Sequence, residues 1–253
     1  MKLVVWNILH GGGPHRTPEI ALTLIEHRPD VVVLLEFRGP RGGQLRAVLA
    51  DAGLAYQFVS SAPPGLNGVL IASRWIGRES MQVEVPPVLA PKLLAVELET
   101  STLGSLTLVG VHVPDDGSPT ARARTWESLV EFARGHQCRA LIAGDLNTGR
   151  HRVDEQGSTF THTKSLGELA MAGYVDVWRK HNPSSPERTW VGSDPISRVL
   201  RPGGSRIDAV WASADLAKRV NKATLWHAQR TARVSDHALL SIEFAPSEAP
   251  HEG

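Results

Sequence analysis

Apolar runs of strand length recur along the chain, and they constrain its fold more than any other feature. Eight of them are rich in Val, Leu and Ile and are bounded by Gly, Pro or Asp, as buried strands are. They lie at 2–9, 30–37, 67–73, 93–100, 105–113, 139–147, 206–213 and 237–245. The order of these runs and of the helices between them therefore decides the fold class.

Three other segments have helical periodicity, at 18–28, 119–136 and 164–181. The first follows Thr17 and has Pro18 in its first turn, where proline is tolerated. Strand and helix alternate at first, then strands follow one another from residue 56 to 113, and alternation returns afterwards. This mixture predicts an α/β fold of two packed sheets with helices outside, rather than one parallel sheet.

The composition suits one large domain. Of the 253 residues, 42% are hydrophobic, which is enough for one sizeable core. We expect a single domain over residues 1–245 and a disordered tail over 246–253. The only cysteine, Cys138, excludes an intrachain disulfide and a cysteine zinc site. No run reaches the ~20 apolar residues of a membrane span, and the N-terminus lacks a signal-peptide core. We therefore expect a soluble, cytoplasmic monomer without a membrane partner.

Charge is distributed unevenly along the chain. The net charge is only +1, but residues 179–233 carry eleven Lys and Arg against four Asp and Glu, which leaves the remainder six negative. A protein with one face turned towards phosphates has such an asymmetry. A chance bias on a solvated surface is the alternative.

The stretch LIAGDLNTGR, at 141–150, ends an apolar run with Asp145 and Asn147. Because side chains at i and i+2 of a strand point to the same side, we expect both to project together beyond the strand. Ligands commonly bind at such strand ends. The alternative is a simple turn signal, since Asp and Asn are common in turns.

Five further runs place an acid, an amide or an imidazole at one end. These residues are Asn7, Glu36, His112, Asp208, Asp236 and His237. Together with Asp145, the acids Glu36, Asp208 and Asp236 would form a cluster of four carboxylates. Without a cation these would repel one another, and burying unpaired carboxylates is costly. Carboxylate and amide oxygens suit Mg²⁺. Taken singly, Asn7 could satisfy strand backbone, Glu36 could pair with Arg38 or Arg41, and either histidine could be structural.

The segments WN, LLEF, GVHVP, GDLN, RIDAVWAS and SDHALL occur in this order, and together they resemble the endonuclease/exonuclease/phosphatase superfamily of metal-dependent phosphoesterases. The resemblance runs from about residue 2 to 244. It implies a four-layer α/β-sandwich of the DNase I-like kind, in which two packed mixed β-sheets are flanked by helices. The third quarter of the chain resembles the exonuclease III and apurinic-endonuclease branch.

Three positions depart from that branch. It has Tyr and Asn where this chain has His112 and Asp115, and an acid where this chain has Leu9. The histidine is closer to pancreatic-type deoxyribonucleases and sphingomyelinase-like members. These departures speak against abasic-site repair and leave phosphodiester hydrolysis as the expected chemistry.

The resemblance also implies roles for individual residues. Glu36 is the principal Mg²⁺ ligand, with Asn7 and Asp236 contributing, and Mn²⁺ is a substitute ion. His237 is a general base or transition-state stabiliser, with Asp208 holding its other ring nitrogen. The remaining catalytic candidates are Asp145 and Asn147, for the attacking water, and His112, for a phosphoryl or leaving oxygen. Lys92 and Arg206 are candidates for contact with substrate phosphate.

Other candidates are the glycine-rich loop at 10–16, with His15 and Arg16, and the basic loop with Arg198 and Arg201. Trp190 could stack on a base or belong to the core. The expected function is a Mg²⁺-dependent phosphodiesterase, a nuclease acting on DNA. A phosphoesterase of a small molecule or lipid headgroup is the alternative, and the intact polar set opposes a catalytically silent binding module.

Overall fold

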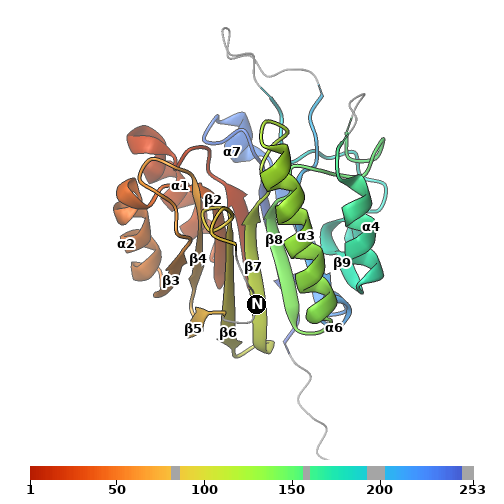
Figure 1. The fold of residues 1–253 in the computed structure, drawn as a ribbon. Helices are drawn as coiled ribbons and strands as arrows, with labels where there is room; N and C mark the ends of the chain where they lie inside the picture. The colour runs from red at the N-terminus through yellow and green to blue at the C-terminus, as the bar shows by residue number, and fades with distance from the viewer. Residues whose placement is uncertain (81–85, 156–159, 193–202, 247–253) are drawn as a thin grey trace, which may run out of the picture.

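The computed structural model of the chain describes residues 1–80, 86–155, 160–192 and 203–246. Two six-stranded sheets formed by these described residues pack face to face, and helices cover their outer faces (Figure 1). The architecture is the predicted four-layer α/β-sandwich. The single domain over residues 1–245 stays a prediction, and residues 247–253 of the predicted tail lie outside the described residues.

The first sheet is built around a parallel pair of strands. Its order is β11-β12-β1-β2-β4-β3, in which β1 and β2 are parallel and the other neighbours are antiparallel. The strands are β1 (Lys2–Asn7), β2 (Val31–Phe37), β3 (Tyr56–Val59), β4 (Gly68–Ser73), β11 (Val220–Trp226) and β12 (Leu239–Phe244).

The second sheet repeats this plan. Its order is β5-β6-β7-β8-β10-β9, with β7 and β8 parallel. The other neighbours are antiparallel. The strands are β5 (Gly77–Glu79), β6 (Leu93–Thr100), β7 (Gly104–His112), β8 (Ala140–Asp145), β9 (Tyr174–Asp176) and β10 (Asp208–Ser213).

The longer helices supply the outer layers. Helices α1 (Gly13–His27) and α2 (Gly43–Asp51) bury apolar residues against the first sheet, and α3 (Pro119–Gly135) and α4 (Thr163–Met171) do so against the second. The shorter elements are η1 (Gly39–Arg41), α5 (Val177–His181), α6 (Ala214–Ala217) and α7 (Ala228–Thr231).

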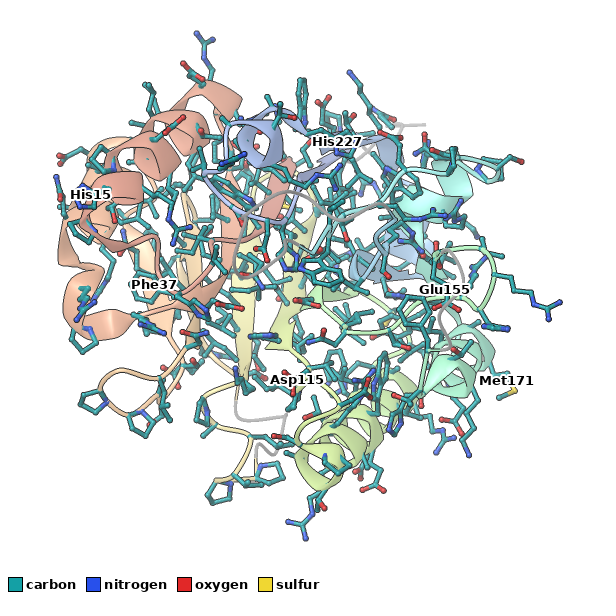
Figure 2. The ribbon with its side chains drawn as sticks, turned by 90° about the horizontal axis from the view of Figure 1, so that it is seen from above. His15, Phe37, Asp115, Glu155, Met171 and His227 are labelled. Carbon is teal, nitrogen blue, oxygen red and sulfur yellow. The ribbon has the colours of Figure 1, made fainter. Side chains whose placement is uncertain are left out.

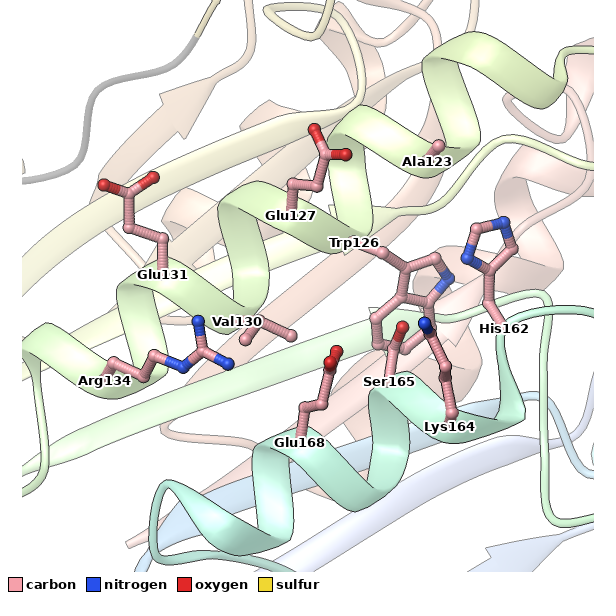
Figure 3. A pocket seen from close by; sticks show the side chains of 10 residues that line it. All are labelled: Ala123, Trp126, Glu127, Val130, Glu131, Arg134, His162, Lys164, Ser165 and Glu168. Carbon is pink, nitrogen blue, oxygen red and sulfur yellow. The ribbon is translucent and has the colours of Figure 1, made fainter.

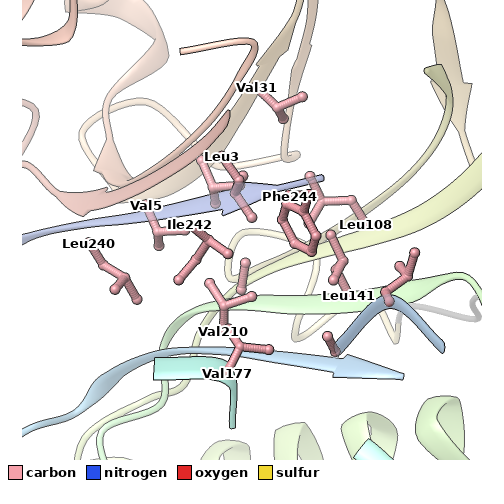
Figure 4. Packing of buried hydrophobic residues seen from close by; sticks show 14 of the residues in the cluster. Leu3, Val5, Val31, Leu108, Leu141, Val177, Val210, Leu240, Ile242 and Phe244 are labelled. Atoms are coloured by element: carbon pink, nitrogen blue, oxygen red, sulfur yellow. The ribbon is translucent and has the colours of Figure 1, made fainter. Parts of the chain in front are cut away.

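Successive side chains of a strand point to opposite faces of its sheet, and here both faces pack against apolar layers. In β1, Leu3 and Val5 point into the core between the sheets, whereas Val4 and Trp6 pack against the first helical layer. Figure 4 shows the inter-sheet core, where Leu3 and Val5 meet side chains from the opposite sheet. Strands buried on both faces read as continuous apolar runs, which is why the sequence revealed them.

Two helix predictions need correction. The first helix begins at Gly13 with a proline in its first turn, so Pro18 lies inside it rather than at its start. The segment at 164–181 is not one helix. Helix α4 ends at Met171, Gly173 adopts a left-handed conformation with φ 90°, and a short strand and a second helix follow. Residues other than glycine rarely adopt this backbone conformation, so Gly173 allows the chain to turn there.

Candidate active site

The predicted polar residues gather at one end of the sandwich because of strand direction. The carboxyl ends of parallel strands share an edge with the amino ends of their antiparallel neighbours. In the second sheet His112, Asp145 and Asp208 are register partners on three adjacent strands. Figure 2 looks onto the sandwich from above, with Phe37, Asp115, Glu155 and His227 around the centre of the view.

Asp145 lies at the centre of the cluster and is almost fully buried. Its Oδ2 accepts a hydrogen bond from Asn7 Nδ2 at 3.2 Å, and it lies 3.9 Å from both His112 Nε2 and His237 Nε2. Burial raises the pKa of Asp145 to about 7, and the neighbouring Asp208 carboxylate adds to the effect. The carboxyl group can therefore exchange a proton near neutral pH.

His237 and Asp208 form a buried hydrogen-bonded pair. Nδ1 of the ring lies 2.8 Å from Asp208 Oδ2. Burial by itself would lower the pKa of His237, but the Asp208 carboxylate outweighs it and raises the pKa to about 10. The imidazole is therefore protonated at neutral pH, and its Nε2–H faces Asp145.

Glu36 sits at the end of β2 in a left-handed conformation, with φ 58°. Its Oε2 accepts from the His10 backbone N–H at 2.7 Å and from Asn67 Nδ2 at 2.8 Å, and the His10 ring nitrogen Nδ1 lies 2.8 Å away. Burial by itself would raise the pKa of Glu36, but His112 and the His10 contacts outweigh it and lower the pKa. The ion pair with Arg38 or Arg41 that was the alternative is not among its contacts in the described residues.

Asn7 joins the two sheets at this end. Its Nδ2 donates to Glu36 Oε1 at 3.3 Å, on the first sheet, and to Asp145 Oδ2 at 3.2 Å, on the second. Its Oδ1 accepts from the Leu9 backbone N–H at 3.0 Å. One amide therefore fixes the separation of two carboxylates that come from different sheets.

His112 and Lys92 form a second pair of basic groups. Lys92 Nζ lies 3.3 Å from His112 Nδ1. Burial lowers the pKa of His112 to about 3, and the Lys92 charge acts in the same direction. Burial also lowers the pKa of Lys92, against the influence of Glu36 and Asp145. The imidazole is therefore neutral at physiological pH.

Asp236 lies beside the same ring nitrogen of His237 that Asp145 approaches. Its Oδ2 accepts from the Trp190 indole N–H at 3.1 Å, and its Oδ1 lies 3.9 Å from His237 Nε2. Oδ1 is buried without a hydrogen-bond partner, and so is Asp208 Oδ1. Orphaned buried carboxylate oxygens are rare in native structures, and such oxygens fit a site that takes up a cation.

Asn147 is close to Asp145 but not in the way the strand pattern predicted. Strand β8 ends at Asp145, and Asn147 has φ 47°, so the two side chains do not alternate as in a strand. The Asn147 backbone N–H donates to Asp145 Oδ1 at 2.9 Å, and Nδ2 donates to the Val113 carbonyl at 2.7 Å. The turn formed by Asp145 and Asn147 therefore also fixes the Asp145 side chain in the site.

The prediction that Arg206 contacts substrate phosphate does not fit the structure. Its guanidinium is buried and donates to Asp154 Oδ1 at 2.8 Å and to Asp176 Oδ2 at 2.6 Å. Buried arginines are paired in this way because an unpaired charge is costly. Arg206 is a structural ion-pair partner, while Arg198 and Arg201 lie outside the described residues.

Three residues at the site do more than the sequence indicated. Arg16 donates to the Leu9 and Val234 carbonyls, each at 2.7 Å, and so ties two loops of the site together instead of extending towards phosphate. His10 and Asn67 contact Glu36 but were not predicted to do so. The adjoining loop has positive φ at every residue from Leu9 to Gly13, which no local polar pattern signals.

A groove with a volume of about 560 Å³ lies away from these residues, between α3 and α4. Figure 3 shows Glu127, Glu131 and Arg134 on α3 opposite Lys164 and Glu168 on α4. None of the predicted site residues lines this groove, so it is separate from the cluster around Asp145.

Comparison with known proteins identifies the family. The model of the endonuclease/exonuclease/phosphatase family matches residues 4–237. The chain belongs to this family. The resemblance predicted from the sequence is thereby confirmed.

Solved structures share the fold of this family member at low sequence identity. An AP endonuclease from Archaeoglobus fulgidus is 22% identical, with a TM-score of 0.79 over 96% of this chain and 99% of that chain. A 3′ phosphatase from Neisseria, bound to product DNA hairpin, is 21% identical, with a TM-score of 0.77 over 96% and 99%.

A curated relative is much longer than this chain. An uncharacterized 149 kDa protein of transposon TX1 from Xenopus laevis is 29% identical over 182 residues. The match covers 67% of this chain but only 13% of that protein. In the parts of the chain that the structure describes, every helix is too short or too polar to cross a bilayer.

Proposed function

We propose that this protein is a Mg²⁺-dependent nuclease that hydrolyses phosphodiester bonds in DNA. The observation that carries the proposal is the contact set around Asp145, in which an amide and two imidazoles surround one carboxylate of raised pKa. Such a set can move a proton and stabilise charge at a phosphoryl group.

Glu36, Asn7 and Asp236 would hold the ion. Glu36 retains some solvent exposure, which suits Mg²⁺ because this ion keeps several waters and takes few protein ligands. Coordination through the Asn7 oxygen requires the amide to turn and give up its bond to the Leu9 N–H. When bound, the metal would act as a Lewis acid towards phosphoryl oxygen.

A second group of residues could hold a metal. The ligand atoms of Asp145, Asp208 and His237 lie within 4.8 Å of one another. This group includes an imidazole that is already hydrogen-bonded to Asp208, and hard Mg²⁺ prefers oxygen ligands. We therefore assign Mg²⁺, with Mn²⁺ as its substitute, to the Glu36 side.

The remaining residues would accept the proton of the attacking water and stabilise the negative charge that develops during the reaction. Asp145, with a pKa near neutrality, accepts the proton of the attacking water. Protonated His237 stabilises the developing negative charge, which of its two expected roles suits an imidazolium better than that of general base. Lys92 and His112, which lie 3.3 Å apart, would contact the phosphoryl group of the substrate. Asn147 stabilises the turn that orients Asp145.

DNA is the proposed substrate for two reasons. Two solved structures of the same fold carry DNA-directed names, an AP endonuclease and a 3′ phosphatase bound to a DNA hairpin. Without the buried and paired Arg179 and Arg206, residues 179–233 still carry nine Lys and Arg against four Asp and Glu, which leaves positive charge in the segment that carries Trp190. The cytoplasmic location and the monomeric state stay predictions.

The deciding experiment compares labelled duplex, single-stranded and abasic DNA with a panel of phosphomonoesters. Each is incubated with Mg²⁺, with Mn²⁺ and with a chelator, and the Asp145→Asn variant is the control for contaminating nuclease. Metal-dependent cleavage of DNA by the wild type alone supports the proposal. Cleavage of only small phosphoesters would refute the nuclease and favour a small-molecule or lipid-headgroup substrate.

Salt dependence supplies an independent check. Binding that neutralises several phosphates weakens steeply as salt rises, because condensed counterions are released. A substrate with one phosphate responds little. We expect the affinity for DNA, measured with the Asp145→Asn variant, to fall strongly between low and high salt.

A further inference from the structure

Thr189 lies outside the predicted site, yet its hydroxyl group uses its full hydrogen-bonding capacity at the start of β10. The side chain is fully buried. Oγ1 accepts the backbone N–H groups of Ile207 at 2.9 Å and Asp208 at 3.0 Å, and donates to the Ser205 carbonyl at 3.4 Å. A hydroxyl has one donor and two acceptor sites. These bonds therefore fix the backbone that carries Asp208.

The main chain around Thr189 holds the other member of the buried pair. The Thr189 carbonyl accepts the Ala238 N–H at 2.6 Å. Trp190 forms antiparallel bridges with both Ser205 and His237. The segment at 189–190 therefore lies between the chain that carries Asp208 and the chain that carries His237.

We propose that Thr189 is a positioning residue that sets the hydrogen bond between Asp208 and His237. The proposal rests on the proposed function, because it concerns the imidazole assigned to the chemistry. The two partners are 29 residues apart in sequence, and their 2.8 Å contact depends on segments that meet at Thr189. Without the hydroxyl, two buried N–H groups lose their acceptor, and the start of β10 must shift to satisfy them.

The kinetic test compares Thr189→Val, which keeps the shape but lacks the hydroxyl, with Thr189→Ser, which keeps the hydroxyl. We expect kcat on DNA to fall by about 10²-fold in the valine variant, the scale associated with a displacement near 1 Å. KM should change little, and serine should restore most of the rate. Equal kcat values for valine and wild type would overturn the proposal.

A second readout needs no substrate. The proton held between His237 Nδ1 and Asp208 Oδ2 is expected to give a low-field proton signal, assigned by its loss in Asp208→Asn. The signal should persist in Thr189→Ser and be shifted or lost in Thr189→Val. A slow valine variant with an unchanged signal would overturn the positioning role. If the wild type shows the signal, Thr189→Val shifts or removes it, and the wild type cleaves no DNA, the proposed function is refuted and the positioning role stands.

Folding is checked by circular dichroism and thermal unfolding of each variant. If Thr189→Val does not fold, Thr189→Ala replaces it in both measurements. If neither folds while Thr189→Ser does, the hydroxyl supports the whole fold rather than one pair, and the positioning assignment is wrong.

Discussion

At the scale of single residues, the environment of two groups suits them to different tasks in proton transfer. Burial leaves Asp145 able to take up a proton near neutral pH, whereas Asp208 keeps His237 charged. The pKa of both groups is raised, and strongly shifted pKa values at neighbouring titratable groups are typical of sites that perform acid–base chemistry. The same contacts therefore define which group accepts a proton and which stabilises negative charge.

Replacement of either group should abolish most of the activity without unfolding the protein. We expect Asp145→Asn and His237→Ala each to lower kcat by about 10²–10⁴-fold, the usual contribution of a positioned acid or base. Thermal unfolding measured beside the kinetics controls for misfolding. Wild-type turnover by either folded variant would remove the role assigned to that residue.

The location of the metal is a separate residue-scale prediction. Glu36→Gln should weaken Mn²⁺ or Mg²⁺ binding, measured by calorimetry, by about 10-fold or more, since even outer contacts of a metal site contribute on that scale. Glu131→Gln, in the groove between α3 and α4, is the matched control and should bind normally. Loss of binding in Asp208→Asn with normal binding in Glu36→Gln would place the ion in the buried group instead.

At the scale of elements, a buried ion-pair network braces the segment before β10. Arg206 and Arg179 share Asp154, and Arg206 also binds Asp176 at the end of β9. Although burial by itself would raise the pKa of Asp154, Arg206 holds it below its ordinary value. The carboxylate therefore stabilises the fold fully above its unfolded pKa of about 3.9. That stability is lost as the pH falls through the lower folded pKa.

Replacement of Arg206 should lower the stability of the protein, because the buried carboxylates lose a partner. Arg206→Met leaves two buried carboxylates short of a partner and should lower the unfolding free energy at pH 7 by about 3–5 kcal/mol. The difference from wild type should shrink at acid pH, where the carboxylates of the variant are protonated. Urea unfolding at pH 7 and pH 4 measures both effects. Arg152→Met, at an exposed position, is the control and should change stability by about 0.5 kcal/mol or less.

The strands were easier to predict from sequence than the shorter elements. Strands such as β1 and β8 lie between two apolar layers, so every residue except the polar ones at their ends is apolar or glycine. The short strand β9 has only three residues, and its neighbours continue a helical pattern, so local sequence gives no boundary except Gly173. Tertiary pairing with β10 decides its conformation.

The predicted site residues share one property, which is a polar group at the end of an apolar run. That property led to Glu36 and Asp145 in the sequence, and the structure brings both into contact with Asn7. Asn67 also has it, as the first residue of the apolar run at 67–73, but it was not among the predicted site residues. His10 lies just beyond the run at 2–9 and reaches Glu36 through a left-handed turn. Arg206 was misassigned because sequence shows its charge but not its burial.

At the scale of the whole molecule, Gly110 marks a close approach of the two sheets. A methyl group added there would lie 2.9 Å from Val69 Cγ1 and 3.1 Å from Val33 Cγ1, both on the opposite sheet. Gly110→Val should therefore destabilise the fold by about 1–3 kcal/mol, as overpacking of a core does. Thermal unfolding measures the change.

Gly167 offers the matched control for this change. It is exposed within α4 and an added Cβ meets no atom within 4 Å. Gly167→Ala should stabilise the protein by about 0.5–1 kcal/mol, because alanine favours the helix. Equal stability of Gly110→Val and wild type would show that the sheets separate without cost.

The amide of Asn7 spans the boundary between the two halves of the sandwich, and this has a consequence during biosynthesis. Neither sheet by itself carries all the residues of the proposed active site. A chain in which only one sheet has formed would therefore lack the proposed activity. Under the proposed function, a nascent or partly unfolded chain poses no threat to the genome of its own cell. Packing of the two sheets against each other would therefore complete the proposed active site.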